Sequence, residues 1–409
     1  MTSRRFFLKG SALAMAGAGG APAWLVRAAA RTCLRGKVLV VVFQRGAADG
    51  LNIVVPYGDS RYYSLRPTIH VPRPGYGDDA ALDLDGFFGL HPSLAPLKPL
   101  YHSKALAVVD AVGSPDPTRS HFDAQDFMES GTPGRRATQN GWLNRALPAE
   151  IGAPSPLRAV SIGPELPLTL QGANPAVAVS NLQSFRLPNP AVTGAFASMY
   201  GDATDSTLRS AVRETFEAVA IIQRLDQEPY APSGDVEYPN GRLGQSLRQI
   251  ARLIKANVGL EVAFAEIDGW DHHVNELGAK ATEGQLANVL REFGQSLAAF
   301  YADLGPRIED VTVVTMSEFG RTAHENGDRG TDHGHANVMF VMGGGVRGGR
   351  VYGDWPGLAD ARLYEGRDLA LTTDFRDVLA ELVVKHLGNR DVGSVFPGYA
   401  QPRFRNLLI

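Results

Sequence analysis

The sequence predicts an α/β fold in which a mostly parallel central sheet is flanked by helices and carries long loop insertions. Continuous apolar runs of five to nine residues recur along the chain, and such runs are typical of strands buried on both faces. Amphipathic segments alternate with these runs, and strands that alternate with helices build parallel sheets. No internal repeat or low-complexity tract interrupts the pattern. We therefore expect one large domain over residues 31–409.

The expected elements follow from this alternation. The candidate strands are residues 37–43, 105–112, 259–267, 311–316 and 338–342. The candidate helices are residues 206–225, 242–255, 282–304 and 374–387. Two segments rich in proline, glycine and asparagine, at 56–100 and 148–200, are typical of long loops or of an inserted substructure. We expect these two segments to decorate the sheet and to determine substrate specificity.

The first thirty residues have the order of features of a twin-arginine signal peptide. Arg4 and Arg5 stand side by side, a stretch rich in alanine and glycine follows at 11–23, and Ala28 and Ala30 provide a small-residue cleavage site. We expect export by the twin-arginine machinery, cleavage after Ala30 and a periplasmic or extracellular location. The alternative is an amphipathic N-terminal helix with two chance arginines. The stretch is shorter than the ~20 apolar residues that span a membrane, so we expect no transmembrane segment in the mature chain.

Charge and cysteine content narrow the class of partner. The formal net charge of −3 becomes −7 when Arg4, Arg5, Lys9 and Arg27 leave with the signal peptide. We do not expect so acidic a chain to bind nucleic acid or an anionic membrane surface. Cys33 is the only cysteine, so any metal must be held by histidine and carboxylate side chains.

Six of the ten histidines fall in three groups, each expected to follow a strand: His272 with His273, His324 with His333 and His335, and His121. Ligand sites in open parallel sheets form beyond the C-terminal ends of the strands. In the motif EIDGWDHH, Asp268 and His272 stand four residues apart just past a predicted strand. A carboxylate and an imidazole at such a turn can face one cation. A polar turn in which Asp268 caps the next helix explains the motif equally well.

The second motif, residues 330–349, offers Asp332, His333 and His335, then a strand and a glycine-rich turn. His333 is flanked by glycine and has a ligand-type side chain, so it is the candidate ligand here. The glycines of residues 343–349 are more simply explained as a flexible hairpin.

In the third motif, Ser120 lies between a predicted strand and a predicted helix. A helix N-terminus presents free N–H groups and a partial positive charge, and a hydroxyl there can be activated as a nucleophile beside a metal. Taken alone, Ser120 is more simply explained as the N-cap of that helix.

Two further loops follow predicted strands. The loop SEFGRT contains Glu318 and Arg321, and the loop FQRGAADGLN contains Arg45, Asp49 and Asn52. Catalytic roles and salt bridges at strand ends explain these residues equally well.

In their order along the chain, these motifs resemble the alkaline phosphatase superfamily, which includes sulfatases and nucleotide pyrophosphatases. More narrowly, most of residues 37–390 resembles the family called domain of unknown function 1501, whose members are often exported by the twin-arginine route. The superfamily binds one metal through D-x-x-x-H and a later histidine. The resemblance therefore implies an alkaline phosphatase-like fold, with Asp268, His272 and His333 as metal ligands and Ser120 as the nucleophile.

The chain also departs from the superfamily pattern. The second metal there uses an aspartate after the first strand and an adjacent Asp-His pair, which aligns with Glu318 and Phe319. The first aspartate aligns with Arg45 in the strictest register, and with Asp49 only after a shift of four. Glu318 and Asp49 are thus the candidate second-site ligands, and Arg45 or Arg321 could replace the missing positive charge. The sulfatase motif C-x-P-S-R is absent, which excludes a formylglycine mechanism.

The resemblance implies an exported metal-dependent hydrolase of a small-molecule or envelope phosphoester, or in second place of a sulfate ester. Zinc is the expected ion, with manganese, magnesium or calcium as alternatives. The second hypothesis is a non-catalytic envelope protein that keeps the fold and binds a ligand at a degenerate site. Metal content separates the two hypotheses, because an enzyme of this class must bind at least one ion.

Overall fold

The computed structural model describes residues 36–148, 154–182, 217–226 and 229–409. In this part of the chain a nine-stranded sheet has the order β11-β5-β10-β9-β1-β8-β6-β7, and β12 pairs with β5. Its strands are β1 (Val38–Gln44), β5 (Leu106–Gly113), β6 (Ala159–Ile162), β7 (Val177–Val179), β8 (Val262–Ile267), β9 (Val311–Ser317), β10 (Asn337–Gly343), β11 (Val351–Tyr352) and β12 (Thr373–Asp374).

Strand direction brings the loops with candidate site residues to one edge of this sheet. β1 pairs in parallel with β8 and β9, with Val41 opposite Phe264 and Val314. β10 runs antiparallel to both β9 and β5, so β10 begins at the edge where the other strands end. Residues 330–336 lie in the segment that follows β9 and leads into β10. They reach the same edge because β10 runs in the opposite direction.

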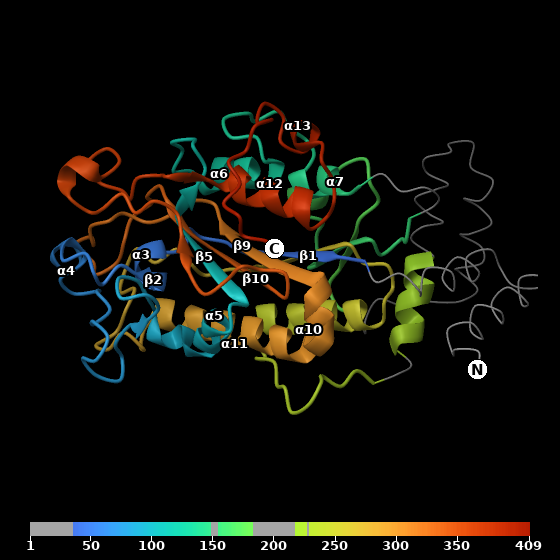
Figure 1. Cartoon of the computed structure of the whole chain (residues 1–409), viewed down its shortest axis with the longest axis horizontal. Coiled ribbons are helices and arrows are strands. Elements are labelled where there is room, and N and C mark those ends of the chain that lie inside the picture. Colours follow the sequence, from blue (N-terminus) through green and yellow to red (C-terminus); the bar gives the residue numbers. More distant parts are fainter. Residues whose placement is uncertain (1–35, 149–153, 183–216, 227–228) are drawn as a thin grey trace, which may run out of the picture.

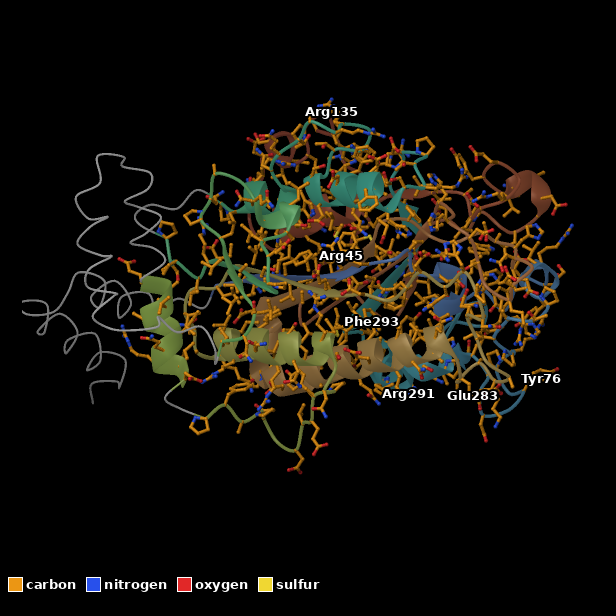
Figure 2. The ribbon with its side chains drawn as sticks, turned by 180° about the vertical axis from the view of Figure 1, so that it is seen from behind. Arg45, Tyr76, Arg135, Glu283, Arg291 and Phe293 are labelled. Atoms are coloured by element: carbon orange, nitrogen blue, oxygen red, sulfur yellow. The ribbon has the colours of Figure 1, made fainter. Side chains whose placement is uncertain are left out.

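Helices cover both faces of the sheet (Figure 1). One face carries α6 (His121–Ser130), α7 (Trp142–Ala146), α12 (Phe375–Lys385) and α13 (Val392–Val395), and the other carries α5 (Lys98–His102), α10 (Arg242–Lys255) and α11 (Gln285–Leu304). Alternate residues of β1 enter the two cores: Val40 lies in the core that contains α10 and α11 residues, and Leu39 in the core that contains α12 residues. In Figure 2, Phe293 of α11 lies toward the sheet, whereas Arg291 lies on the outer side of that helix. Coverage of both faces explains why the β1 run is continuously apolar.

A small substructure occupies the predicted insertion at residues 56–100. Its three-stranded sheet consists of β2 (Val54–Val55), β3 (Leu82–Asp83) and β4 (Gly89–Leu90), and α3 (Gly50–Ile53), α4 (Arg61–Leu65) and the 3-10 helix η1 (Pro92–Leu97) accompany it. The remaining short elements are the 3-10 helices η2 (Leu168–Leu170), η3 (Gly305–Asp310) and η4 (Asp360–Arg362).

The predicted mostly parallel sheet flanked by helices is confirmed. All five predicted strands are present, and α10 has the predicted bounds. α11 begins at Gln285 rather than at residue 282, after Gly284 with a φ of 99°. The loop prediction for 148–200 is wrong at β6 and β7, because strands of four and three residues are too short to show a hydrophobic period.

Two predictions touch residues outside the described part. The predicted helix at 206–225 is described from residue 217, and residues 217–226 are helical. The predicted signal peptide at residues 1–30 lies outside the described residues altogether. Within the described residues, no helix is both long enough and apolar enough to cross a membrane.

Candidate metal centre

The loops at the C-terminal edge of the sheet bring four side chains together. His121 is the first residue of α6, after β5, and Asp271 and His273 follow β8. His333 lies just before β10. His121 and His333 are 212 positions apart in the sequence and in contact in the fold. Their proximity depends on the order and direction of β5, β10 and β8 in the sheet.

The ring of His333 contacts the rings of both His121 and His273. Nε2 of His333 lies 3.0 Å from Nε2 of His121 and 3.0 Å from Nε2 of His273. Oδ1 of Asp271 lies 3.0 Å from Nε2 of His273 and 3.3 Å from Nε2 of His333. The ligand atoms of His121, Asp271 and His333 all lie within 4.8 Å of one another. His121, Asp271 and His333 thus form one three-residue group, and His273 adjoins it through its contacts with His333 and Asp271.

The other nitrogen of each ring is hydrogen-bonded to an acceptor. These contacts are His121 Nδ1 to Glu318 Oε1 at 2.9 Å, His333 Nδ1 to the Arg119 carbonyl oxygen at 2.9 Å, and His273 Nδ1 to Asp332 Oδ1 at 3.1 Å. A carbonyl or carboxylate oxygen can only accept, so each neutral imidazole carries its proton on Nδ1. Nε2 of His333 therefore faces the Nε2 lone pairs of His121 and His273, and each pair repels unless a proton or a cation lies between the two nitrogens.

Asp271 adds negative charge to this group and is held by Arg321. Nη1 of Arg321 donates to Oδ1 of Asp271 at 2.7 Å, and the Arg321 side chain is fully buried. Partial burial raises the pKa of the Asp271 carboxyl, but the hydrogen bond and the charge of Arg321 outweigh it, and the pKa lies below its ordinary value. Asp271 is therefore ionised at neutral pH.

This donor set fits a zinc-like cation. Three imidazole nitrogens and one carboxylate oxygen are ligands that zinc accepts, and the contacts at Nδ1 are of the kind that orient metal-binding imidazoles. The side chains of His121 and His333 are each 24% exposed and that of Asp271 is 44% exposed, so the group is open to a small ligand.

Glu318 binds the His121 ring at Nδ1, the nitrogen that faces away from His333. Its fully buried carboxylate also accepts hydrogen bonds from the backbone N–H of Gly46 and the side-chain amide of Gln125, both at 2.9 Å. Burial raises the pKa of Glu318, but these hydrogen bonds, with that from His121 first, lower it below its ordinary value. The hydrogen bond to Glu318 is also the largest influence on His121 and raises its pKa. The ionised carboxylate therefore fixes the orientation of the His121 ring.

Phe319 forms an apolar wall beside two of the rings. Its ring centroid lies 5.0 Å from that of His121 and 5.1 Å from that of His333. It is 3% exposed and packs with Ala47 and Ala124. An apolar side chain thus lies at this side of the group, against the rings of His121 and His333, and it offers no metal ligand.

Three of the predicted ligands lie outside this group. Asp268 Oδ2 accepts from Nη1 of Arg242 at 2.5 Å, and its side chain is 55% exposed. His272 is buried with neither ring nitrogen hydrogen-bonded, and burial is the main cause that lowers its pKa to about 4. Asp49 is buried against Arg66. Of the predicted ligands, the structure brings His333 into the group and places Glu318 one hydrogen bond away from it.

The backbone after β8 explains why Asp271 and His273 reach the group. A spacing of four brings two side chains together on a helix, but residues 268–272 are not helical and Gly269 has a φ of 91°. Backbone hydrogen bonds instead link residues two apart, from His272 N–H to the Trp270 carbonyl oxygen and from His273 N–H to the Asp271 carbonyl oxygen, and Asp271 and His273 face the same group. In the sequence DHH, the D-x-H spacing of Asp271 and His273 could have indicated that these two residues, rather than Asp268 and His272, face one cation. His121 belongs to the third sequence motif, but nothing in the spacing of that motif marked it as a ligand.

The predicted catalytic residues have other contacts as well. Ser120 is the N-cap of α6, as the simpler interpretation predicted, and its Oγ accepts from the backbone N–H of Asp123 at 3.5 Å. Arg45 forms ion pairs with Glu266 at 2.5 Å and with Glu129 at 2.9 Å. Figure 2 labels Arg45 at the level of the central sheet.

A second polar cluster, the buried network, lies behind Arg321. Nε of Arg321 donates to Oγ1 of Thr331 at 3.1 Å, and Thr331 donates to Oε2 of Glu276 at 2.9 Å. Glu276 shares a hydrogen bond with Asp49, and Arg66 donates to both oxygens of Asp49. Burial and the charge of Asp49 raise the pKa of Glu276 well above its ordinary value. Burial also raises the pKa of Asp49, but Arg66 outweighs it, so Glu276 keeps the proton and Asp49 the charge.

Comparison with known proteins shows the family to which this chain belongs. Residues 101–393, more than half of the chain, match the model of the family described as Protein of unknown function (DUF1501). This segment includes His121, Asp271, His273 and His333. No curated protein matches the chain in sequence.

Two solved structures resemble the chain at low identity. The C-terminal periplasmic domain of EcEptC from Escherichia coli, in a complex with Zn, is 12% identical, with 92% of each chain covered and a TM-score of 0.39. The lipoteichoic acid synthase LtaP from Listeria monocytogenes is 9% identical over 76% of this chain and 65% of that chain, with a TM-score of 0.32.

Proposed function

We propose that this chain, which belongs to the family described as Protein of unknown function (DUF1501), is an exported metal-dependent hydrolase of phosphoesters. One observation carries the proposal: ligand atoms of His121, Asp271 and His333 lie within 4.8 Å of one another where the parallel strands end, and His273 contacts two of these residues. His121, Asp271, His273 and His333 would hold the ion. Sulfate esters are the second substrate class, because they present the same tetrahedral arrangement of oxygens.

The ion and the chain have separate tasks in this proposal. A bound zinc-like ion supplies a Lewis acid and lowers the pKa of a hydroxyl group beside it. The chain supplies orientation: Glu318 and Asp332 fix two of the rings, and Arg321 fixes Asp271. Fixed ligands favour catalysis because little reorganisation is needed when the reaction begins.

Ser120 is the candidate nucleophile, as the resemblance implies. It stands directly before His121, and its 3.5 Å contact with the N–H of Asp123 is long enough to be exchanged for a contact with substrate. The first turn of the ten-residue helix α6 offers free N–H groups and a positive dipole end to an oxyanion. Of the two candidate arginines, Arg321 touches Asp271, whereas Arg45 already forms two ion pairs.

Metal binding is the first test. We expect the mature protein to retain one equivalent of zinc after dialysis, and His333→Ala to weaken zinc binding by at least about a hundredfold, because a ligand matters more than the outer partners that cost ~10–100-fold. His102→Ala, at an exposed histidine at the end of α5, is the matched control and should bind zinc normally. Elemental analysis and chelator competition measure both. Wild-type protein without stoichiometric metal would remove the proposal.

Turnover is the second test. Zinc-loaded protein should hydrolyse a member of a panel of phosphate monoesters, phosphate diesters and sulfate esters. Ser120→Ala should lose turnover, keep its zinc and still unfold cooperatively, with a loss of about 1 kcal/mol because the N-cap of α6 is removed. Full activity in Ser120→Ala would show that Ser120 is not the nucleophile, and it would leave the proposal of a metal-dependent hydrolase standing.

The second candidate function is a non-catalytic envelope binding protein. Phe319 favours it, because an apolar wall stands where the superfamily has a second-metal ligand. A zinc-loaded protein that binds phosphate or vanadate but hydrolyses no ester of the panel would support this function over the enzymatic one.

Export and domain organisation remain part of the proposal. Residues 1–30 would act as a twin-arginine signal and residues 31–409 as one alkaline phosphatase-like domain. Cell fractionation of the Arg4→Lys, Arg5→Lys variant tests the signal, since lysine does not reproduce the planar guanidinium fork. Normal export of this variant would show that the twin-arginine interpretation is wrong.

A further inference from the structure

Exposed apolar side chains are concentrated beside the candidate metal centre. Phe122 follows His121 in the chain and is 86% exposed, and Val274 follows His273 and is 48% exposed. Among the described residues, the other large exposed hydrophobic side chains are Tyr76, Phe404 and Ile409. Two of these five residues, Phe122 and Val274, therefore directly follow the histidines whose Nε2 atoms contact His333.

Adjacency along the chain places Phe122 and Val274 at the rim of the group. Consecutive Cα atoms are 3.8 Å apart across a trans peptide, so each side chain starts within that distance of a site histidine. Successive side chains on a helix diverge by about 100°, so the Phe122 side chain starts beside His121 and lies in solvent rather than among the nitrogens. An exposed phenylalanine in this position is available to a bound molecule.

The charged groups of the same rim are acidic or already paired. Arg119 and Arg367 both form ion pairs with Asp368, at 2.6 and 2.9 Å. The side chains of Asp271 and Asp332 are 44% and 57% exposed. A substrate with further negative charges would meet carboxylates here, whereas an apolar group would meet Phe122 and Val274.

We infer that Phe122 and Val274 form an apolar subsite beside the candidate metal centre, and that the substrate is an oxyanion ester with an alkyl or aryl group close to the ester bond. The identity of the oxyanion rests on the proposed function. Hydrolysis of such a phosphoester breaks the bond between phosphorus and the ester oxygen. Water supplies the hydroxyl that phosphorus gains and the proton that the leaving alcohol gains.

Binding of phosphonates tests the subsite without turnover. Ethylphosphonate, octylphosphonate and phenylphosphonate are titrated calorimetrically into zinc-loaded protein. Octylphosphonate and phenylphosphonate should bind about tenfold more tightly than ethylphosphonate, the smaller end of what a hydrophobic pocket discriminates. Phe122→Ser should remove most of this difference and Val274→Ser part of it, while zinc content stays unchanged.

Phe404→Ser is the matched control. Phe404 is 37% exposed and lies against Lys385, whose neighbour His386 hydrogen-bonds the carbonyl oxygen of Val38 at the start of β1. This is the edge of the sheet opposite the candidate metal centre. The control should therefore keep the full preference for octylphosphonate.

The outcomes separate the subsite from the activity. A preference for octylphosphonate that Phe122→Ser abolishes, in a protein that hydrolyses no ester, supports the subsite and removes the proposed activity. Equal affinity for ethylphosphonate and octylphosphonate, or no phosphonate binding at all, overturns the subsite. Soluble octyl phosphate and phosphatidate in phosphatidylcholine vesicles then distinguish a small-molecule source of the apolar group from a lipid source, and hydrolysis of either supports the inference.

Discussion

The candidate metal centre and the buried network lie on either side of Arg321, and they neutralise their charges in different ways. In the buried network, the side chains of Arg66 and Asp49 are 0% and 2% exposed and pair with each other, and Glu276 keeps its proton. In the candidate metal centre, Nε2 of His333 faces the Nε2 atoms of His121 and His273 beside the half-exposed Asp271, and Arg321 is the buried cation that touches Asp271.

This difference separates a structural cluster from a functional one. A cluster whose donors and acceptors satisfy one another needs nothing from outside, and its effect is on stability. A cluster in which acceptors converge is complete only when a cation binds. Thr331 links the two, because it accepts from Arg321 and donates to Glu276. The buried network thus holds Arg321, and through it Asp271, in place.

The largest effect should come from breaking the buried pair. Arg66→Met should lower the free energy of unfolding by about 3–5 kcal/mol, because it leaves Asp49 charged and buried. Urea unfolding followed by circular dichroism measures the loss. Arg136→Met is the matched control: its ion pair with Asp123 lies on the surface, with the Arg136 side chain 75% exposed, and should change stability by less than about 1 kcal/mol.

A double variant keeps this prediction testable if Arg66→Met does not fold. Asp49→Asn combined with Arg66→Met removes the uncompensated charge and should recover part of the lost stability. Equal stability of Arg66→Met and the wild type would contradict a structural role for the pair.

The second largest effect should be a loss of stability in acid, caused by protonation of the buried His91. Its ring is 0% exposed, its Nδ1 accepts from the N–H of Ser93 at 3.1 Å, and burial lowers its pKa to about 3. The unfolded histidine titrates near pH 6.5, so this stability is fully present above pH 6.5 and is lost as the pH falls toward 3. At about 1.4 kcal/mol per pH unit, the loss at pH 5 is about 2 kcal/mol.

Urea unfolding at pH 7 and pH 5 checks the sign and the size of this effect. His91→Gln should lose less stability than the wild type between the two pH values, because it cannot take up the proton. His102→Gln, at an exposed histidine, should behave like the wild type. An identical pH dependence in His91→Gln and the wild type would show that His91 does not contribute.

The smallest effect should come from loosening one outer contact of the candidate metal centre. Asp332→Asn replaces the carboxylate that accepts from Nδ1 of His273, and zinc affinity should fall about tenfold. Competition with a chelator measures the change. Asp328→Asn, at an exposed aspartate of the same loop, is the control and should leave affinity unchanged. An unchanged affinity in Asp332→Asn would mean that this contact does not orient the ring.

The family and the framework of the fold were accessible from the sequence, because they depend on local pattern. The apolar runs that became β1, β5, β8, β9 and β10 are long enough to show burial on both faces. The short strands β6 and β7 are not. The motif residues at strand ends were recognisable as residue types, and His333 reached the candidate metal centre as expected.

The sequence by itself determined that this chain forms a helix-flanked, mostly parallel sheet and that histidines and carboxylates follow its strands. Tertiary structure decided which of them meet. It selected Asp271 and His273 over Asp268 and His272, because the backbone after β8 is not helical. It added His121 from a loop 212 positions away from His333, and it paired Asp49 with Arg66 inside the buried network. The physical reason is that such contacts depend on the direction of β10 and on the rotation of each side chain about its own backbone, and neither is encoded in residue spacing.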